Sequence, residues 1–306
     1  MNPREWALII FTILGQMAAG SILVLMLVRA YLASKAKTEE VDRILEWPTF
    51  ITVPVMALAL LASLLHLSNL ANVVKAVPNL GSSWLSREVV LGVVFMALAV
   101  IYTFMQWRKL GSNSVRTAIG WVTALVGIAQ TYAMGMVYMI RTQPAWNTLA
   151  TPITFFVTSL LLGGLAVAVV MLINHDQAAK KNSKIAEKQL PLLRQVIQGI
   201  ALGAVLLLGT EFLILPIYMA YLATQGSAAL QSLMLMVGPY LGTLVLRLLL
   251  VFVGAGILAM YLYRNAGIPG REKAMATLTY SAFVLVLVGE VMGRVLFYAS
   301  HVRIGL

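Results

Sequence analysis

The chain of 306 residues contains no cysteine, only three histidines, and few charged residues, at 11% of the total. Without cysteine it forms no disulfide, ligates no iron–sulfur cluster and attaches no haem covalently. A bis-histidine haem needs two imidazoles that face each other from different helices, and His66, His175 and His301 leave no second pair to carry electrons across a membrane. We therefore expect no haem, no iron–sulfur cluster, no molybdenum and no other metal in this chain.

Apolar residues dominate the sequence, with 60% hydrophobic residues and a mean hydropathy of +0.89. Soluble domains carry about a quarter charged residues, whereas continuous apolar runs of ~20 residues are typical of membrane-spanning helices. The sequence therefore predicts an all-α, polytopic integral membrane protein, with eight transmembrane helices bundled in a single membrane domain, residues 1–306. We expect the spans at residues 6–31, 48–67, 89–107, 118–140, 153–173, 196–221, 233–263 and 274–299.

Basic residues are distributed unevenly between the connectors of these spans. The net charge of +11 does not indicate a nucleic-acid partner, because the positive charges lie in short connectors where membrane orientation explains them. The connectors after the first, third, fifth and seventh spans hold fourteen basic residues: Lys35, Lys37, Arg43, Arg108, Lys109, Arg116, Lys180, Lys181, Lys184, Lys188, Arg194, Arg264, Arg271 and Lys273. The opposite side holds five: Arg4, Lys75, Arg87, Arg141 and Arg303.

Since the basic connectors of a membrane protein stay in the cytoplasm, this distribution predicts the orientation of the chain. Both termini then lie on the outer (periplasmic) side of the cytoplasmic (inner) membrane of a prokaryote. The charged segment 174–191 becomes a solvated cytoplasmic linker. The connector from His66 to Glu88 faces outward.

Ionisable residues inside the predicted spans are few, and such residues usually mark a pathway, a pair or a site. At ~1.5 Å of rise per residue, Glu211, Glu290 and Arg294 fall in the outer half of the membrane, and Arg247 falls near the middle. A proton pump or ion carrier needs relay groups in the inner half as well, and that half is almost bare. The distribution favours a one-sided site for a lipid-soluble molecule that carries protons, such as a quinol. His66 or Glu88 would then accept a proton from its hydroxyl group.

Each candidate also has a purely structural interpretation. His66 would only hydrogen-bond a neighbouring helix, and Glu88 would complete a capping box at the start of its helix. Glu290 and Arg294, spaced i and i+4, would neutralise each other on one helix face. Glu211 and Arg247, on consecutive spans, would form a second buried charge pair.

Several segments, in this order, resemble one family over nearly the whole chain. They are EWALIIFTILGQMAAGSILVL, SLLHLSNL, LSREV, PAWNTLATPITFFVTSLLLGG, TEF, YLGTLVLR and GEVMGRVLFYASH. Together they resemble the membrane-anchor subunit of anaerobic dimethyl sulfoxide reductases. The resemblance implies a menaquinol-oxidising anchor without haem, docked on its outer face to an iron–sulfur subunit with four clusters. That subunit passes electrons to a molybdopterin catalytic subunit.

The resemblance also implies roles for individual residues. A histidine at the position of His66 and a glutamate at the position of Glu88 are associated with menaquinol in this family. We expect the head group near these two residues, Arg294 and Tyr298. Glu290 and His301, in the closing segment GEVMGRVLFYASH, complete the predicted quinol-binding set.

Two other functions stay open at this point. A quinone-reactive membrane subunit of the polysulfide or nitrite reductase type would share the chemistry but couple it to proton movement across the membrane. A secondary transporter is favoured by helix-breaking residues inside spans, namely Pro54, Gly163, Gly164, Pro216 and Gly242.

Overall fold

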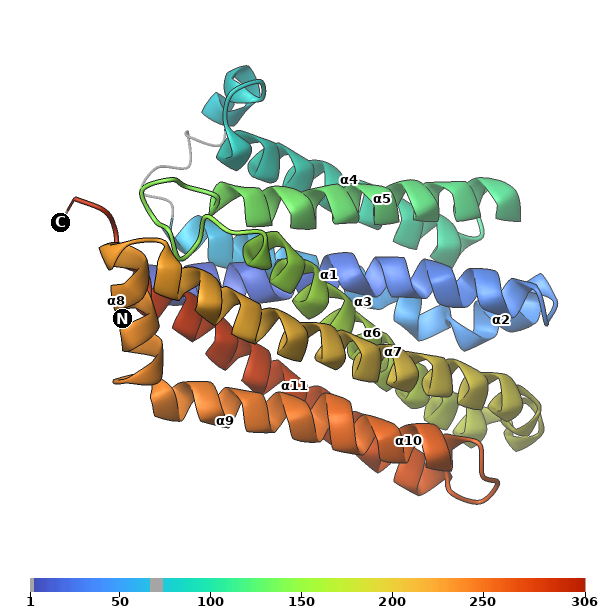
Figure 1. Cartoon of the computed structure of the whole chain (residues 1–306). Helices are drawn as coiled ribbons and strands as arrows, with labels where there is room; N and C mark the ends of the chain where they lie inside the picture. Colours follow the sequence, from blue (N-terminus) through green and yellow to red (C-terminus); the bar gives the residue numbers. More distant parts are fainter. Residues whose placement is uncertain (1–2, 67–73, 306) are drawn as a thin grey trace.

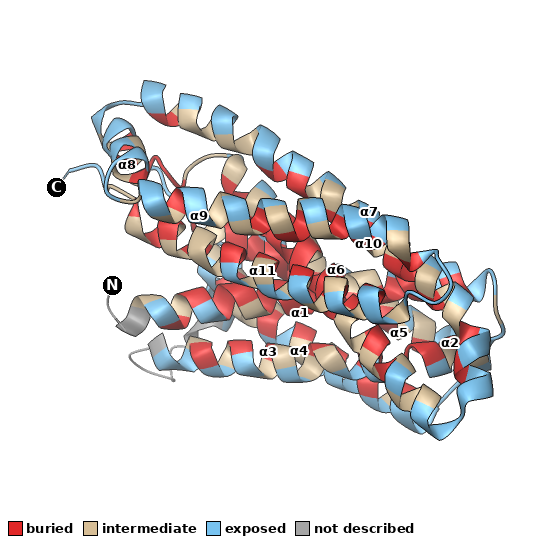
Figure 2. Ribbon diagram, turned by 90° about the horizontal axis from the view of Figure 1, so that it is seen from below, coloured by how far each residue is buried: buried red, intermediate tan, exposed pale blue. Residues whose placement is uncertain are grey.

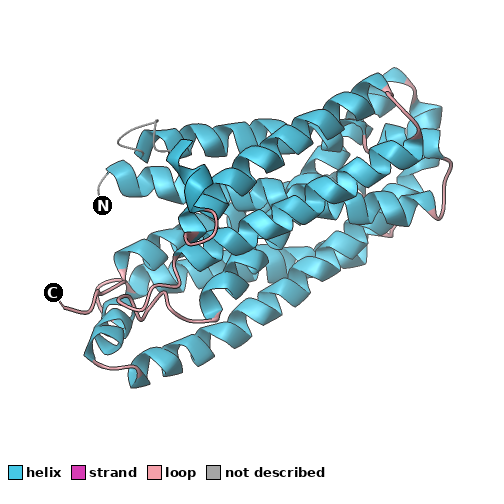
Figure 3. Cartoon of the chain, turned by 90° about the horizontal axis from the view of Figure 1, so that it is seen from above, coloured by secondary structure: helices cyan, strands magenta, loops and turns pink. Residues whose placement is uncertain are grey.

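A computed structural model describes the backbone of residues 3–66 and 74–305, and the side chains of these residues except 3, 4, 66 and 74–76. Every regular element in these ranges is helical (Figure 3). Eight helices are long and apolar enough to cross a membrane, which confirms the predicted number of spans. The spans are α1 (Pro3–Ala33), α3 (Glu46–His66), α4 (Trp84–Arg108), α5 (Asn113–Val137), α6 (Ala150–Lys181), α7 (Ser183–Thr224), the composite of α9 (Leu241–Val251), η3 (Phe252–Leu258) and α10 (Ala259–Ala266), and α11 (Glu272–Ala299).

The two ends of the bundle differ in what they carry. The first helix begins and the last helix ends at the same end, here called the terminal end, as an even number of spans requires (Figure 1). The short helices α8 (Ser227–Val237) and η2 (Val74–Asn79) also lie there. The opposite end, here called the α2 end, carries the short helix α2 (Thr38–Ile44). Which end faces outward stays a prediction from the basic residues.

The helices α1 and α6 form the centre of the bundle. In each, 72% of the most apolar stretch is buried by other parts of the protein, against 22% in α7 (Figure 2). The helices α3, α4 and α5 pack on the α1 side, and α7, α9, α10 and α11 pack on the α6 side. The central pair therefore connects the two halves of the bundle.

Small residues allow α1 and α6 to touch backbone to backbone. A Cβ atom at Gly163 would lie 2.2 Å from the carbonyl carbon of Gly20, and one at Gly20 would lie 1.7 Å from the carbonyl oxygen of Ser159. The Ser159 hydroxyl donates a hydrogen bond of 2.8 Å to the backbone oxygen of Gln16. Close approach through glycine and serine is a common way for membrane helices to associate, because lipid supplies no hydrophobic driving force.

The seventh predicted span, residues 233–263, differs from the structure. A span of this length requires tilt or an interfacial end. In the structure it is interrupted, because α8 ends at Val237 and α9 begins at Leu241. Pro239 lacks a backbone N–H and restricts the preceding residue, so the helix breaks at Gly238. The spanning part is therefore Leu241–Ala266, with a π-helical segment at Phe252–Leu258.

The segment 174–191 is helical over most of its length. The helix α6 continues to Lys181, and α7 starts at Ser183 after a single break at Asn182, whose side chain caps α7 at the Ile185 N–H. Asn174 is buried and donates to the backbone oxygens of Arg43 and Ile44. The expected solvated linker is thus a helical hairpin whose first residue packs against α2.

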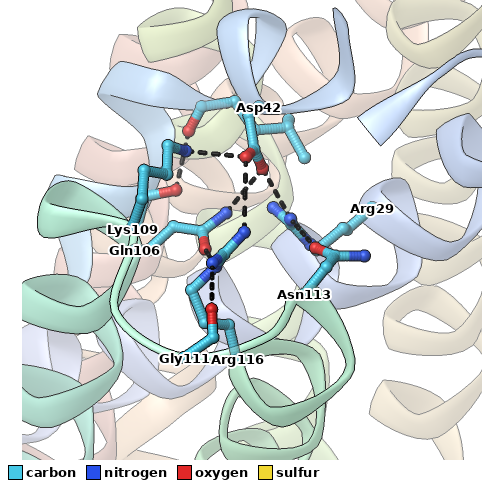
Figure 4. Close-up of polar contacts among 9 residues, drawn as sticks. Arg29, Asp42, Gln106, Lys109, Gly111, Asn113 and Arg116 are labelled. Atoms are coloured by element: carbon cyan, nitrogen blue, oxygen red, sulfur yellow. Dashed lines mark hydrogen bonds and ion pairs between the residues drawn. The ribbon is translucent and has the colours of Figure 1, made fainter. Parts of the chain in front are cut away.

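Asp42 holds α2 against the ends of three spans (Figure 4). Its carboxylate accepts hydrogen bonds from Arg29 at 2.6 Å, from Gln106 at 2.7 Å and from Lys109 at 2.7 Å. Arg116 lies 3.8 Å away and donates to Gln106 at 2.8 Å. Burial raises the pKa of the Asp42 carboxyl, but the hydrogen bonds from Lys109 and Arg29 outweigh this effect, so the pKa lies below its usual range.

Replacing Gly163 with alanine should disrupt the central contact. The added methyl group would meet backbone atoms of α1 that cannot rotate away, so we expect a loss of about 3 kcal/mol or more. Gly203→Ala is the matched control, because a Cβ built there has no described atom within 4 Å apart from its chain neighbours and the backbone of its own helix. Thermal unfolding of the detergent-solubilised chain measures both. Equal midpoints for the two variants would contradict the close contact.

Acid should weaken the bundle through Asp42. Because its folded-state pKa is depressed, its contribution is present above the unfolded-state value of about 3.9 and is lost as the pH falls through the folded-state value. At neutral pH Asp42→Asn should cost about 2 kcal/mol and remove this part of the acid sensitivity. Thermal unfolding between pH 3 and pH 7 tests this, with the exposed Glu39→Gln as control. An unchanged acid profile in Asp42→Asn would contradict the assignment.

Candidate functional site

Arg294 lies at the centre of the buried polar groups in the half of the bundle nearer the terminal end. It is 6% exposed, and its Nη2 donates to the side-chain oxygen of Gln16 on α1 at 3.0 Å. The guanidinium carbon lies 3.8 Å from the ring centre of Phe155 and 5.4 Å from that of Phe297. Aromatic faces attract a cation electrostatically, so these rings and Gln16 fix the position of the charge.

On one side of Arg294 lie two tyrosines and an acid. The hydroxyls of Tyr138 and Tyr298 share a hydrogen bond, and both residues are buried. Glu88, which is 5% exposed on α4, is close enough to both tyrosines to interact with them electrostatically. Ser83 provides the side-chain cap of α4, so the capping-box interpretation of Glu88 is not needed to explain the helix start. Glu88 and Tyr298 therefore lie in the same part of the bundle as Arg294, and their binding of a quinol stays a prediction.

The two histidines of the predicted set lie at the terminal end. His66 is the last residue of α3, and its side chain lies outside the described part of the structure. The Nδ1 of His301 donates to the carbonyl oxygen of Tyr298 at 2.6 Å. The His301 ring stacks on Trp146 at 4.3 Å between centres, and the Trp146 Nε1 donates to the Phe297 oxygen at 2.9 Å. His301 thus lies one layer nearer the end of the bundle than Arg294.

Three further charged residues lie on the other side of Arg294: the buried Glu211 and Glu290, and Arg247, whose side chain is 15% exposed. Together with Arg294 they are here called the four-charge cluster. Glu211 and Arg247 form a hydrogen-bonded ion pair between α7 and α9, as the sequence suggested. Glu290 accepts a hydrogen bond of 2.6 Å from Thr158. Among the described residues no ion pair joins Glu290 to Arg294, so the predicted i, i+4 pairing does not form.

A glycine makes room for the side chain of Arg247. A Cβ atom at Gly293 on α11 would lie 2.4 Å from the Nε and 2.8 Å from the Cζ of Arg247. A Cβ atom at Gly289, one turn earlier, would lie 2.5 Å from Val251 on α9. The Gly-x-x-x-Gly spacing of the GEVMG segment therefore brings α9 against α11 and lets Arg247 reach across it.

Several residues of this region were not singled out from the sequence. Gln130 is fully buried on α5, and neither of its amide atoms has a partner within residues 3–66 and 74–305. The sequence does carry a signal for Gln130, because an amide side chain inside an apolar span is unusual. Tyr138, Trp146 and Thr158 carried no comparable signal, because such residues are common at the ends and interfaces of membrane helices.

Eight long apolar helices among the described residues define a multi-pass membrane protein. Buried charges lie near both ends, around Asp42 at the α2 end and around Arg294 nearer the terminal end. The model of the DMSO reductase anchor subunit (DmsC) family matches residues 1–300, and the chain belongs to this family. It is therefore a membrane-anchor subunit, as the sequence motifs indicated.

Similar proteins cover the same length. The C subunit of anaerobic dimethyl sulfoxide reductase from Escherichia coli (strain K12) is 30% identical over 305 residues, which are 99% of this chain and 97% of that protein. The protein of the same name from Haemophilus influenzae is 29% identical over 304 residues, covering 99% and 96%. The anaerobic dimethyl sulfoxide reductase subunit YnfH of Escherichia coli is 28% identical over 311 residues, covering 99% and 97%.

The ion pair between Glu211 and Arg247 should show strong coupling in a double-mutant cycle. Glu211→Gln alone leaves a buried guanidinium without its counter-charge and should cost about 3–5 kcal/mol. Glu211→Gln combined with Arg247→Gln should recover most of that loss, since neither charge remains. Thermal unfolding of the single and double variants checks this. Strictly additive losses would contradict the pair.

Proposed function

We propose that this chain anchors a DMSO reductase complex in the membrane and oxidises menaquinol at the terminal end of the bundle. The observation that carries the proposal is the gathering of Glu88, Arg294 and the Tyr138–Tyr298 pair in one buried region. These groups come from three different spans and lie near the end where α3 finishes at His66. A membrane-soluble quinol reaches this depth through the bilayer.

Oxidation of menaquinol releases two electrons and two protons, so the site needs proton acceptors and a way to stabilise negative charge. His66 accepts a proton from one hydroxyl, and Glu88 passes it to water at the terminal end. Arg294 stabilises the negative charge that develops on the quinol oxygen as its proton leaves. Its position is preset by Gln16 and the two phenylalanine rings, so little reorganisation accompanies the reaction.

The remaining candidates orient the head group. The hydrogen bond with Tyr138 fixes the position of the Tyr298 hydroxyl. At the terminal end the Trp146 ring stacks on the rings of Phe297 and His301, and the three rings form an aromatic wall. Glu290 lies one turn before Arg294 on α11 and contributes a second carboxylate. Flat aromatic surfaces and a few fixed polar groups suit a naphthoquinol ring.

The electrons leave to partner subunits. An iron–sulfur subunit with four clusters docks at the terminal end, on the outer side of the inner membrane, and passes them to a molybdopterin catalytic subunit. Family membership and the position of the candidate site nearer the terminal end support this arrangement.

Quinol-driven reduction of the iron–sulfur clusters tests the site. In membranes that contain the whole complex, His66→Ala and Glu88→Gln should slow cluster reduction by menaquinol at least ~100-fold, because the proton acceptor is lost. Electron paramagnetic resonance follows the clusters directly. Glu46→Gln, an exposed acid at the α2 end, is the matched control and should leave the rate unchanged.

A chemical reductant that bypasses the quinol separates chemistry from assembly. It should reduce the clusters equally in all variants if the complex is intact. Normal rates with menaquinol in both His66→Ala and Glu88→Gln would show that these residues are structural.

A further inference from the structure

A narrow cavity runs along α11 on the side of Arg294 opposite to Tyr298. Its volume is about 100 Å³, and α11 lines it through Glu290, Gly293, Arg294, Phe297 and Ser300, which share one helix face. At ~1.5 Å per residue this wall extends roughly 15 Å, from the middle of the bundle towards the terminal end. The cavity is therefore elongated along the membrane normal.

Hydroxyl groups line a second wall of the cavity, on α6. Thr151, Thr154 and Thr158 all contribute, and Ser300 faces them from α11 near the terminal end. Thr158 donates to Glu290 at the inner end of the cavity. These residues extend from a buried carboxylate to the end of the bundle. Each hydroxyl donates to a carbonyl or carboxylate oxygen, which leaves its own oxygen free to accept from water.

Four buried polar atoms of the four-charge cluster have no partner among the residues that the structure describes. Two are acceptors, the Oε2 of Glu211 and the Oε1 of Glu290, and two are donors, the Nε of Arg247 and the Nε of Arg294. All four residues line the cavity. Leaving such atoms unsatisfied costs about 1–3 kcal/mol each, and water both donates and accepts. Since a water needs about 10–15 Å³ measured in this way, the cavity has room for roughly seven.

We propose that this cavity is a water-filled proton outlet, with Glu290 as the carboxylate at its inner end. The source of the protons rests on the proposed function. As menaquinol gives its two electrons to the partner's clusters, both hydroxyl O–H bonds break. One proton goes to His66, and the proton of the other hydroxyl passes to the Glu290 carboxylate, which becomes a carboxylic acid. The proton then moves to the cavity water and on to bulk water at the terminal end, and Glu290 returns to its charged form.

The other charges around Glu290 suit this role. Arg247 and Arg294 face it with positive charge, and Glu211 is already paired with Arg247. Because Glu290 has no ion pair of its own with any described residue, it can change charge without breaking one. Thr158 fixes one carboxylate oxygen, and the unpartnered Oε1 is left for water.

The natural lack of cysteine in this chain allows a direct test of hydration. In the whole complex, Thr154→Cys would place a thiol in the cavity, and a small charged methanethiosulfonate reagent reacts with thiolates in contact with water. The matched control is Thr210→Cys, since Thr210 lies on the exposed face of α7 and, like Thr154, donates to its own helix backbone. In the membrane that face meets lipid. Mass measurement of this subunit separates its label from cysteines of the partners.

We expect Thr154→Cys to react at least tenfold faster than Thr210→Cys. The bound label should then obstruct the cavity and slow quinol-driven cluster reduction at least tenfold, and a small membrane-permeant weak acid that carries protons should restore the rate. Labelled Thr210→Cys should behave like the unlabelled complex. Glu290→Gln should show the same slowing and the same rescue.

Two results would overturn the proposal. Equal or slower labelling of Thr154→Cys would show that the cavity is dry, and rapid labelling without any loss of quinol oxidation would show that protons leave by another route. If instead the proposed role of His66 and Glu88 is wrong, the results differ. The variants His66→Ala and Glu88→Gln would then oxidise quinol normally, while labelling at Thr154→Cys would still slow the reaction.

Discussion

The backbone contact between α1 and α6 is the constraint on which the rest of this bundle depends. Gly20 and Gly163 allow the two helices to cross in direct backbone contact, and Ser159 donates across the crossing to the Gln16 oxygen. The crossing fixes Gln16, whose side chain holds Arg294. A packing feature of small residues thereby determines the position of the charge at the centre of the site.

The two ends of the bundle use buried charge differently. At the α2 end, Asp42 satisfies several basic partners, and this network fixes an amphipathic helix to three spans. Nearer the terminal end the charged residues line a cavity. Some of their buried donors and acceptors have no hydrogen-bond partner within the described part of the chain. In the Asp42 network the Nη1 of Arg29 is the guanidinium atom left without a partner among the described residues. Beside Arg294, two donors and two acceptors without partners belong to residues that line one cavity, which indicates a place for water or ligand.

Family membership and geometry give complementary information here. Membership assigns the chain to the membrane anchors of DMSO reductases. The geometry divides the candidate residues into two groups on either side of Arg294. Glu88 and Tyr298 lie in the first group, and Glu290 with the Glu211–Arg247 pair lies in the second. The division leads to separate proposed roles: quinol binds and gives up one proton on the first side, and the other proton leaves through the cavity on the second.

The sequence alone determined the class of protein and the number of spans, because long apolar runs have few stable solutions in a membrane. It also indicated the family and the Glu211–Arg247 pair. Tertiary structure decided the rest. Only the packing of α6 against α11 brings Thr158 to Glu290, and only the glycines of α11 let Arg247 cross it. Such contacts join residues more than a hundred positions apart or depend on the absence of a side chain, and neither leaves a local pattern in the sequence.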